Sequence, residues 1–170
     1  MYVKTAPRRS FANWLLIGLH LFLGIGAVFG GVALVIDPSG DMLGMPSDIM
    51  QIELFPNYLI PGIILLVFMG ICPLIVAWGL LTKRECKWAE RLNVFKKSHW
   101  SWAYSLYISI ILIIWISVET YILNAVAIVH LFYIALGLAI QIVTVLPIVN
   151  EAYLKETEED AIETRENIRE

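Results

Sequence analysis

The chain has 170 residues, of which 59% are hydrophobic and 16% are charged, with a formal net charge of −3 at pH 7. Its mean hydropathy is +0.74, whereas a soluble domain is usually about 45–50% apolar and about 25% charged. This composition argues against an ordinary soluble domain. Because the apolar residues gather in long blocks, it predicts an all-α integral membrane protein.

Four apolar blocks reach or approach the ~20 residues that a helix needs to cross the ~30 Å hydrocarbon core of a bilayer. None shows the alternating pattern of a barrel strand. We therefore expect a four-helix transmembrane domain over residues 1–150 and an acidic cytoplasmic tail over residues 151–170. The tail either stays solvated, extends the fourth helix or docks onto a partner. The expected spans are residues 12–36, 58–82, 100–118 and 124–149.

Basic residues predict the orientation of the four-helix bundle. Lys4, Arg8 and Arg9 precede the first span, and six Lys or Arg residues lie within residues 83–97, whereas residues 37–57 contain none. Since basic connections stay in the cytoplasm, both termini should be cytoplasmic and residues 37–57 should face outward. The first block is longer than the apolar region of a signal peptide, about 7–15 residues, so we expect it to be retained.

Residues 37–57 form a connection with enough turn chemistry to predict a short folded cap between the first two spans, the outer lid. Asp-Pro-Ser-Gly is typical of a type I turn, and a second Gly and Pro mark a further break before a short helix over residues 48–55. Met42, Met45 and Met50 raise the question of copper(I). The loop has no His or Cys, and methionine also fills apolar gaps, so we expect no metal. The turn residues of the outer lid are Asp37, Pro38, Gly40, Gly44 and Pro46.

The connection from Lys83 to Lys97 is basic and aromatic. Trp88, Leu92 and Phe95 recur at i, i+4 and i+7, which predicts a short helix in the headgroup layer with its basic residues near anionic lipid. The alternative is an ordinary cytoplasmic loop whose aromatic residues lie at the interface. Both interpretations place this connection on the membrane, and neither implies a nucleic-acid partner.

Small and polar residues mark the helix faces that meet other helices in a bilayer. Asn13 and His20 share one face of the first span, and Ser101 and Ser105 share one face of the third. Pro73 should kink the second span near its middle. A Gly-x-x-x-Gly pair in the first span offers either a close approach between helices or a face for a homo-oligomer. The glycines expected at helix contacts are Gly26, Gly30, Gly31, Gly62, Gly70 and Gly137.

Ionisable residues within membrane spans are rare and often functional. With a rise of ~1.5 Å per residue, His20 and His130 differ by roughly 15 Å in depth, so they cannot share a metal ion. Glu119 should lie at the height of His130, so the two are able to pair at the outer end. The alternative is that Glu119 is hydrated at the interface and that His130 bonds a backbone carbonyl. The candidate ligand-binding residues are Glu119, Asn124, His130, Gln141 and His20.

Motifs of known catalytic sites are absent from the sequence. It contains no HExxH, GxSxG or P-loop motif, and its two cysteines, Cys72 and Cys86, form no CxxC. We therefore assign no catalytic residue, and the sequence identifies no cofactor.

Four sequence features resemble a family of small, uncharacterised prokaryotic integral membrane proteins. They are the Gly30-Gly31 pair, the "DPSG" and "LGMP" turns, the "FPNYLIPG" sequence that opens the second span, and "YIALG" in the last span. The resemblance covers the four spans and fades at the termini. It implies a four-helix protein of the prokaryotic cytoplasmic membrane and transfers no catalytic residue, because no activity is established for the family.

Three functions are compatible with these patterns. The first is a non-enzymatic membrane protein that binds a lipid, quinone or other small apolar ligand, or that serves as an accessory subunit of another membrane protein. The second is a small transporter or channel, alone or as a homo-oligomer, although no inverted repeat is evident. The third is an enzyme that modifies a lipid or quinone, with His20 or His130 as the proton carrier. The missing motifs favour the first, and the sequence does not decide whether the protein is an enzyme.

Overall fold

A computed structural model describes residues 9–45, 55–123 and 127–155 of the chain. Within these ranges the ordered elements are helices, and the one β-bridge is isolated. The predicted all-α architecture is confirmed, and four helices are long and apolar enough to cross a membrane. They are Phe11–Ile36, Leu59–Thr82, Trp100–Tyr121 and Ile128–Val145.

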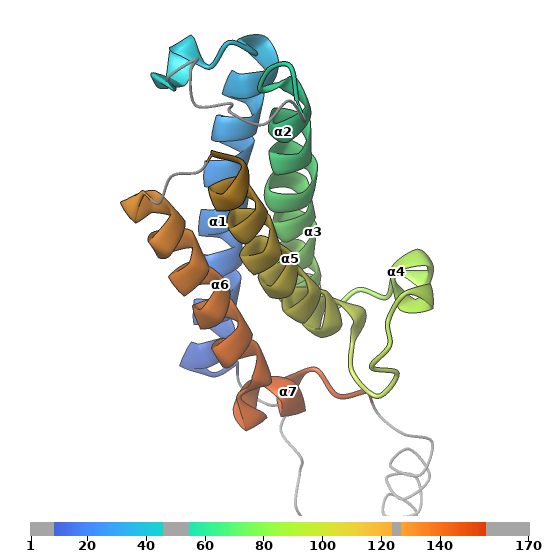
Figure 1. The fold of residues 1–170 in the computed structure, drawn as a ribbon. Coiled ribbons are helices and arrows are strands. Elements are labelled where there is room, and N and C mark those ends of the chain that lie inside the picture. The colour runs from blue at the N-terminus through green and yellow to red at the C-terminus, as the bar shows by residue number, and fades with distance from the viewer. Residues whose placement is uncertain (1–8, 46–54, 124–126, 156–170) are drawn as a thin grey trace, which may run out of the picture.

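Seven α-helices, one 3₁₀ turn and one π-helical stretch make up the described chain (Figure 1). In chain order they are α1 (Phe11–Ile36), η1 (Asp41–Leu43), α2 (Leu59–Ile64), η3 (Leu65–Ile71), α3 (Cys72–Thr82), α4 (Lys87–Arg91), α5 (Trp100–Leu123), α6 (Ile128–Val145) and α7 (Pro147–Ala152).

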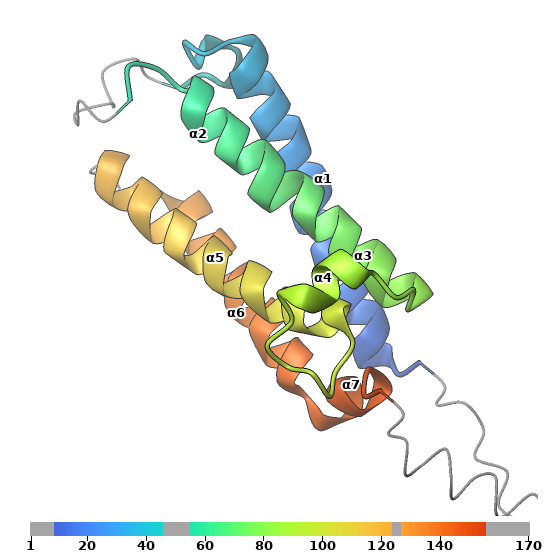
Figure 2. The same cartoon turned by 90° about the vertical axis from the view of Figure 1, so that its right-hand side faces the viewer.

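The bundle consists of two helical hairpins. α1 packs along the continuous second span of α2, η3 and α3, and α5 packs along α6. The hairpins touch mainly through α3 with α5 and through α1 with α6. Figures 1 and 2 show them close together where α4 and α7 lie, here called the α7 end, and apart at the opposite η1 end. Arg9 donates a hydrogen bond to the Leu81 carbonyl, and Lys155 pairs with Glu90, so the described chain enters and leaves at the α7 end.

Glycines let α1 and the second span approach each other closely. A Cβ atom on Gly31 would lie 2.7 Å from the backbone nitrogen of Leu66, and one on Gly62 would lie 2.7 Å from Cβ of Leu34. At these distances there is no room for a side chain at either glycine. Gly31 and Gly62 therefore allow α1 and the second span to pack closely. Close contacts of the same kind involve Gly24, Gly70, Gly79 and Gly137.

The expected Gly26 and Gly30 seam is not one of these close approaches. A Cβ atom on Gly26 would have its nearest neighbour, the Tyr133 hydroxyl, at 3.7 Å, and one on Gly30 would lie 3.5 Å from Leu65. Gly26 is exposed because it lies about 200° around the helix from Gly24, which faces the second span.

The second span accommodates its proline by widening. Leu65–Ile71 is a π-helix, and the Cys72 N–H donates to the Val67 carbonyl, five residues earlier. Pro73 has no N–H to donate and crowds the preceding turn. The kink expected at Pro73 stays a prediction, and a π-helical stretch lies directly before the proline.

The third and fourth spans differ from the expected boundaries. α5 continues to Leu123, beyond the predicted end at residue 118. α6 ends at Val145, and Leu146 is extended with φ −56° and ψ 133°, because a residue before proline avoids the helical region. The fourth helix therefore does not run on through residue 149 into the tail. α7 instead turns the chain across the bundle.

Candidate functional site

Glu119 is the carboxylate that α5 places toward the η1 end. It is half-buried, and among the described residues it has no hydrogen bond or ion pair. Tyr58, at the start of the second span and 5% exposed, lies close enough to feel its charge. Burial raises the pKa of Tyr58, and the negative charge of Glu119 raises it further. An acidic group without a partner among the described residues marks the η1 end as a candidate site.

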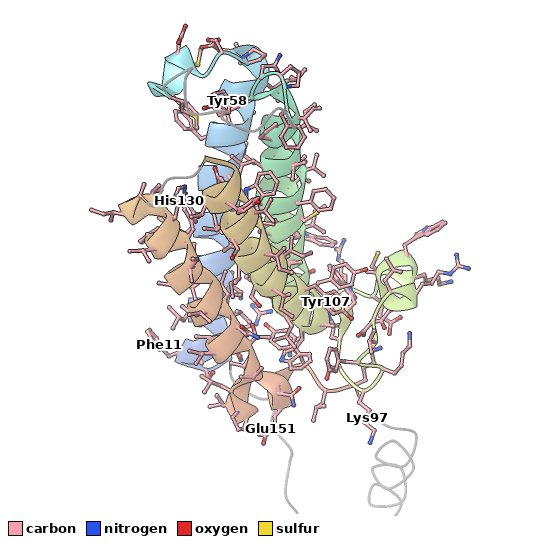
Figure 3. The ribbon with its side chains drawn as sticks, viewed as in Figure 1. Phe11, Tyr58, Lys97, Tyr107, His130 and Glu151 are labelled. Carbon is pink, nitrogen blue, oxygen red and sulfur yellow. The ribbon has the colours of Figure 1, made fainter. Side chains whose placement is uncertain are left out.

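His130 bonds to the backbone at the start of its own helix and does not pair with Glu119. Its Nδ1 accepts from the Ala127 N–H at 3.1 Å, so the ring caps the start of its own helix, and it is 7% exposed. Within the described part of the chain the one ion pair joins Lys155 to Glu90, so Glu119 and His130 do not pair. Figure 3 shows His130 and Tyr58 both toward the η1 end.

The remaining candidate residues are dispersed. His20 is fully buried in α1, with Nε2 2.9 Å from the Ser105 hydroxyl on α5. Gln141 is half-buried on α6, toward the α7 end. Asn124 lies outside the described residues. The described residues contain no group of three His, Cys, Asp or Glu side chains placed to hold a metal ion.

The turn after α1 is built around Asp37. Its Oδ1 accepts from the Ser39 N–H and hydroxyl at 3.2 and 2.5 Å, and its Oδ2 accepts from the Met42 N–H at 2.8 Å. The hydrogen bond from Ser39 and then that from Met42 hold the pKa of this carboxyl below its usual value. Gly40 and Gly44 both have positive φ, 83° and 64°, which explains glycine at each position.

The second span fastens this turn to the bundle. The Tyr58 N–H donates to the Pro38 carbonyl at 3.0 Å, and the Tyr58 ring lies where a side chain on Gly40 would sit. Residues 37–45 are therefore held against the start of the second span through Tyr58. Pro46 and the expected helix over residues 48–55 lie outside the described residues, apart from Phe55.

A polar cluster at the α7 end was not predicted. Glu90 of α4 accepts from the Trp100 N–H, the Asn93 amide and the Lys155 ammonium, at 3.1, 3.2 and 2.7 Å. Asn93, fully buried, also donates to the Ser98 carbonyl at 2.8 Å. Burial alone would raise the pKa of Glu90, but the hydrogen bonds from Lys155 and Asn93 outweigh it, and the pKa is lowered.

Tyr153 anchors the chain that follows α7. It is 2% exposed, and its hydroxyl donates to the Leu80 carbonyl at 3.1 Å. Lys83, whose left-handed backbone ends α3, lies over the Tyr153 ring and donates to the Ala152 carbonyl at 2.8 Å. Burial lowers the pKa of Lys83 and raises that of Tyr153.

His99 connects this cluster to α5. Its Nε2 lies 3.2 Å from the Arg84 carbonyl, and its Nδ1 lies 2.8 Å from the Ser101 hydroxyl. Burial lowers the pKa of His99, which favours the neutral ring at pH 7. A depression of about 480 Å³ lies beside it. Its lining residues are Lys83, Glu85, Glu90, His99, Ala152, Tyr153, Leu154 and Lys155.

The connection between α3 and α5 carries the exposed aromatic and basic groups. α4 forms a single short helix with Trp88 78% exposed, and Leu92 after it is 72% exposed. Phe95 lies beyond the helix and packs edge-on against Trp102, with ring centroids 5.3 Å apart. The expected amphipathic stripe therefore holds for Trp88 and Leu92, but Phe95 turns back to the bundle.

Arginine–aromatic pairs mark the α7 end. The guanidinium groups lie 5.5 to 5.8 Å from the ring centroids, within the range of a cation–π interaction. Aromatic and basic residues gather in this way where helices leave the hydrocarbon. The pairs are Arg9 with Trp14, Arg84 with Trp78, and Arg91 with Trp88.

Comparison of the chain with protein-family models, with curated proteins and with solved structures found no match.

Proposed function

We propose that this multi-pass protein is non-enzymatic and binds a lipid, a quinone or another small apolar molecule at the η1 end. The proposal includes a place in the prokaryotic cytoplasmic membrane, with both termini in the cytoplasm and the outer lid outside. Support for this orientation comes from the basic and aromatic residues at the α7 end. The sequence resemblance described above supports the location.

The observation that carries the proposal is the unpartnered carboxylate of Glu119. A carboxylate at the end of a span, without hydrogen bond or ion pair among the described residues, has unused capacity to accept hydrogen bonds. The carboxylate lies near the end of α5, which runs toward the η1 end, where the two hairpins of apolar helices diverge (Figure 2). A molecule with an apolar body and a hydroxyl or amine head matches both features.

A second contact with lipid is proposed at the α7 end. Trp88 and Leu92 are exposed next to Lys87 and Arg91. Such a surface suits the headgroup layer, where the side chains meet the apolar boundary and the cations meet anionic lipid. This contact would seat the protein in the bilayer, whereas the ligand would bind at the opposite end.

Native mass spectrometry of the full chain released from lipid nanodiscs tests the proposed function. We expect the wild type to retain a stoichiometric small molecule, Glu119→Gln to lose it and Asp41→Asn to keep it. Asp41 is the matched control, an exposed carboxylate at the same end. No retained molecule, or equal retention by both variants, would contradict the proposal. Ion flux in liposomes without a retained ligand would support the transporter or channel instead.

A further inference from the structure

Buried polar side chains of α1 and α5, here called the seam, lie away from Glu119, and His20 contacts Ser105 across them. α1 contributes Asn13 and His20, two turns apart on one face. α5 contributes three serines, one turn apart, and each of the five side chains is at most 1% exposed. Polar groups this deep in an apolar bundle are costly unless each finds a partner. The serines are Ser101, Ser105 and Ser109.

The hydrogen bonds assign the proton on His20. The Ser105 hydroxyl donates its single proton to the Ser101 carbonyl at 3.1 Å, because a carbonyl only accepts. The same oxygen lies 2.9 Å from Nε2 of His20 and is left to accept, so Nε2 carries the hydrogen. The neutral ring then presents Nδ1 as a bare acceptor.

Two acceptors in this seam have no donor. Neither Nδ1 of His20 nor Oδ1 of Asn13 has a hydrogen-bond partner among the described residues, although both atoms are buried. We propose that His20 Nδ1 is a binding site for a small O–H donor, water, within the membrane-spanning bundle. Asn13 Oδ1, about 10 Å nearer the α7 end on the same face, marks the side from which the donor enters.

A series of polar groups lies between this site and the α7 end. From His20, hydrogen bonds lead through the Ser105 hydroxyl to the Ser101 carbonyl. The Ser101 hydroxyl lies 2.8 Å from Nδ1 of His99, and His99 lines the depression at the surface. The polar groups of Ser105, Ser101 and His99 therefore lie between His20 and the depression, while the surrounding core is apolar.

Solid-state NMR on the full chain with ¹⁵N-labelled histidine, in liposomes of a single synthetic lipid without quinone, tests the site. His20→Phe assigns the His20 signals. We expect Nε2 protonated, Nδ1 unprotonated but hydrogen-bonded, and magnetisation transfer to Nδ1 from water protons. Transfer only from the hydroxyl of added quinol would assign the site to that ligand and overturn water as the donor. A Nδ1 without any hydrogen bond would overturn the site altogether.

Two serine variants test the proton assignment. Ser105→Ala removes the acceptor for the Nε2 hydrogen, so we expect the two neutral forms of His20 to appear as a mixture. Ser109→Ala is the matched control, because its hydroxyl donates to Leu106 of its own helix at 2.8 Å, and should leave the spectrum unchanged. An unchanged spectrum in Ser105→Ala would refute the assignment. The site is separate from Glu119, so either proposal can fail alone.

Discussion

The Glu90 carboxylate and the Lys155 ammonium lie 2.7 Å apart, although 65 positions separate them in the chain. Glu90 also accepts from the first N–H of α5, that of Trp100. One carboxylate thus joins α4, the start of α5 and the segment after α7. The α7 end is held together by such contacts between distant segments.

Protonation of Glu90 should weaken the α7 end at low pH. The pKa of Glu90 in the folded protein lies below its ordinary value of 4.5, so its contribution to stability is present above that value. It is lost as the pH falls through the folded pKa. Glu90→Gln should flatten this acid-side fall in unfolding temperature. At pH 7 the variant should lose only about 0.2–1 kcal/mol, because the pair is partly exposed. If the unfolding temperature of Glu90→Gln fell as steeply at low pH as that of the wild type, this role of Glu90 would be contradicted.

Tyr153 should matter through both its ring and its hydroxyl. Tyr153→Ala removes a buried aromatic side chain and should destabilise the detergent-solubilised protein by about 3–5 kcal/mol. Tyr153→Phe keeps the ring and loses the bond to Leu80, so about 1 kcal/mol is expected. Leu154→Ala, at a half-exposed neighbour, is the control. Thermal unfolding followed by circular dichroism measures the series, and equal losses for the two Tyr153 variants would refute the packing role.

Gly40 and Gly44 form a matched pair for the turn after α1. Both have positive φ, so alanine at either costs about 1 kcal/mol in backbone strain. A Cβ on Gly40 would also lie 3.0 Å from the Tyr58 ring, whereas one on Gly44 meets nothing within 4 Å. Gly40→Ala should therefore lower the unfolding temperature more than Gly44→Ala. The reverse order would mean that Tyr58 does not fasten the turn.

Alanine substitutions at Gly31 and Gly18 distinguish the effect of close helix packing from the effect of helix propensity. In Gly31→Ala the new Cβ meets the backbone of Leu66 at 2.7 Å, so the hairpin must open, at about 1–3 kcal/mol. In Gly18→Ala the Cβ meets nothing within 4 Å, and the change should be neutral or slightly stabilising. Denaturant unfolding in mixed micelles compares the two variants, and similar free energies would contradict the close packing at Gly31.

Periodicity predicted the buried face of α1 well. Asn13 and His20, placed on one face by 3.6 residues per turn, are both buried, as are Ser101 and Ser105 on α5. A helix surrounded by lipid turns its polar and small residues inward, and this pattern depends only on local sequence. Hydrogen bonding between helices depends on the tertiary fold and not on local sequence, so the bond between His20 and Ser105 was not foreseen.

Local pattern was less informative at helix ends and over long separations. Pro147 was visible in the sequence, but the apolar run through Val149 concealed the break that it causes at Leu146. Glu90 and Tyr153 find partners 65 and 73 positions away, and no local pattern carries that information. The sequence left open whether Glu119 pairs with His130 or whether His130 bonds a backbone carbonyl, and in the structure the imidazole accepts from the Ala127 backbone N–H.

The contacts of Tyr153 with Leu80 and of Lys155 with Glu90 also have a consequence for folding during translation. A ribosome makes the Leu80 carbonyl 73 residues before the tyrosine that binds it. All four spans are thus translated before this end of the molecule has the segment that closes it. A nascent chain truncated before residue 153 would carry four spans in which Glu90 lacks its ion pair with Lys155, and the last few described residues complete the assembly.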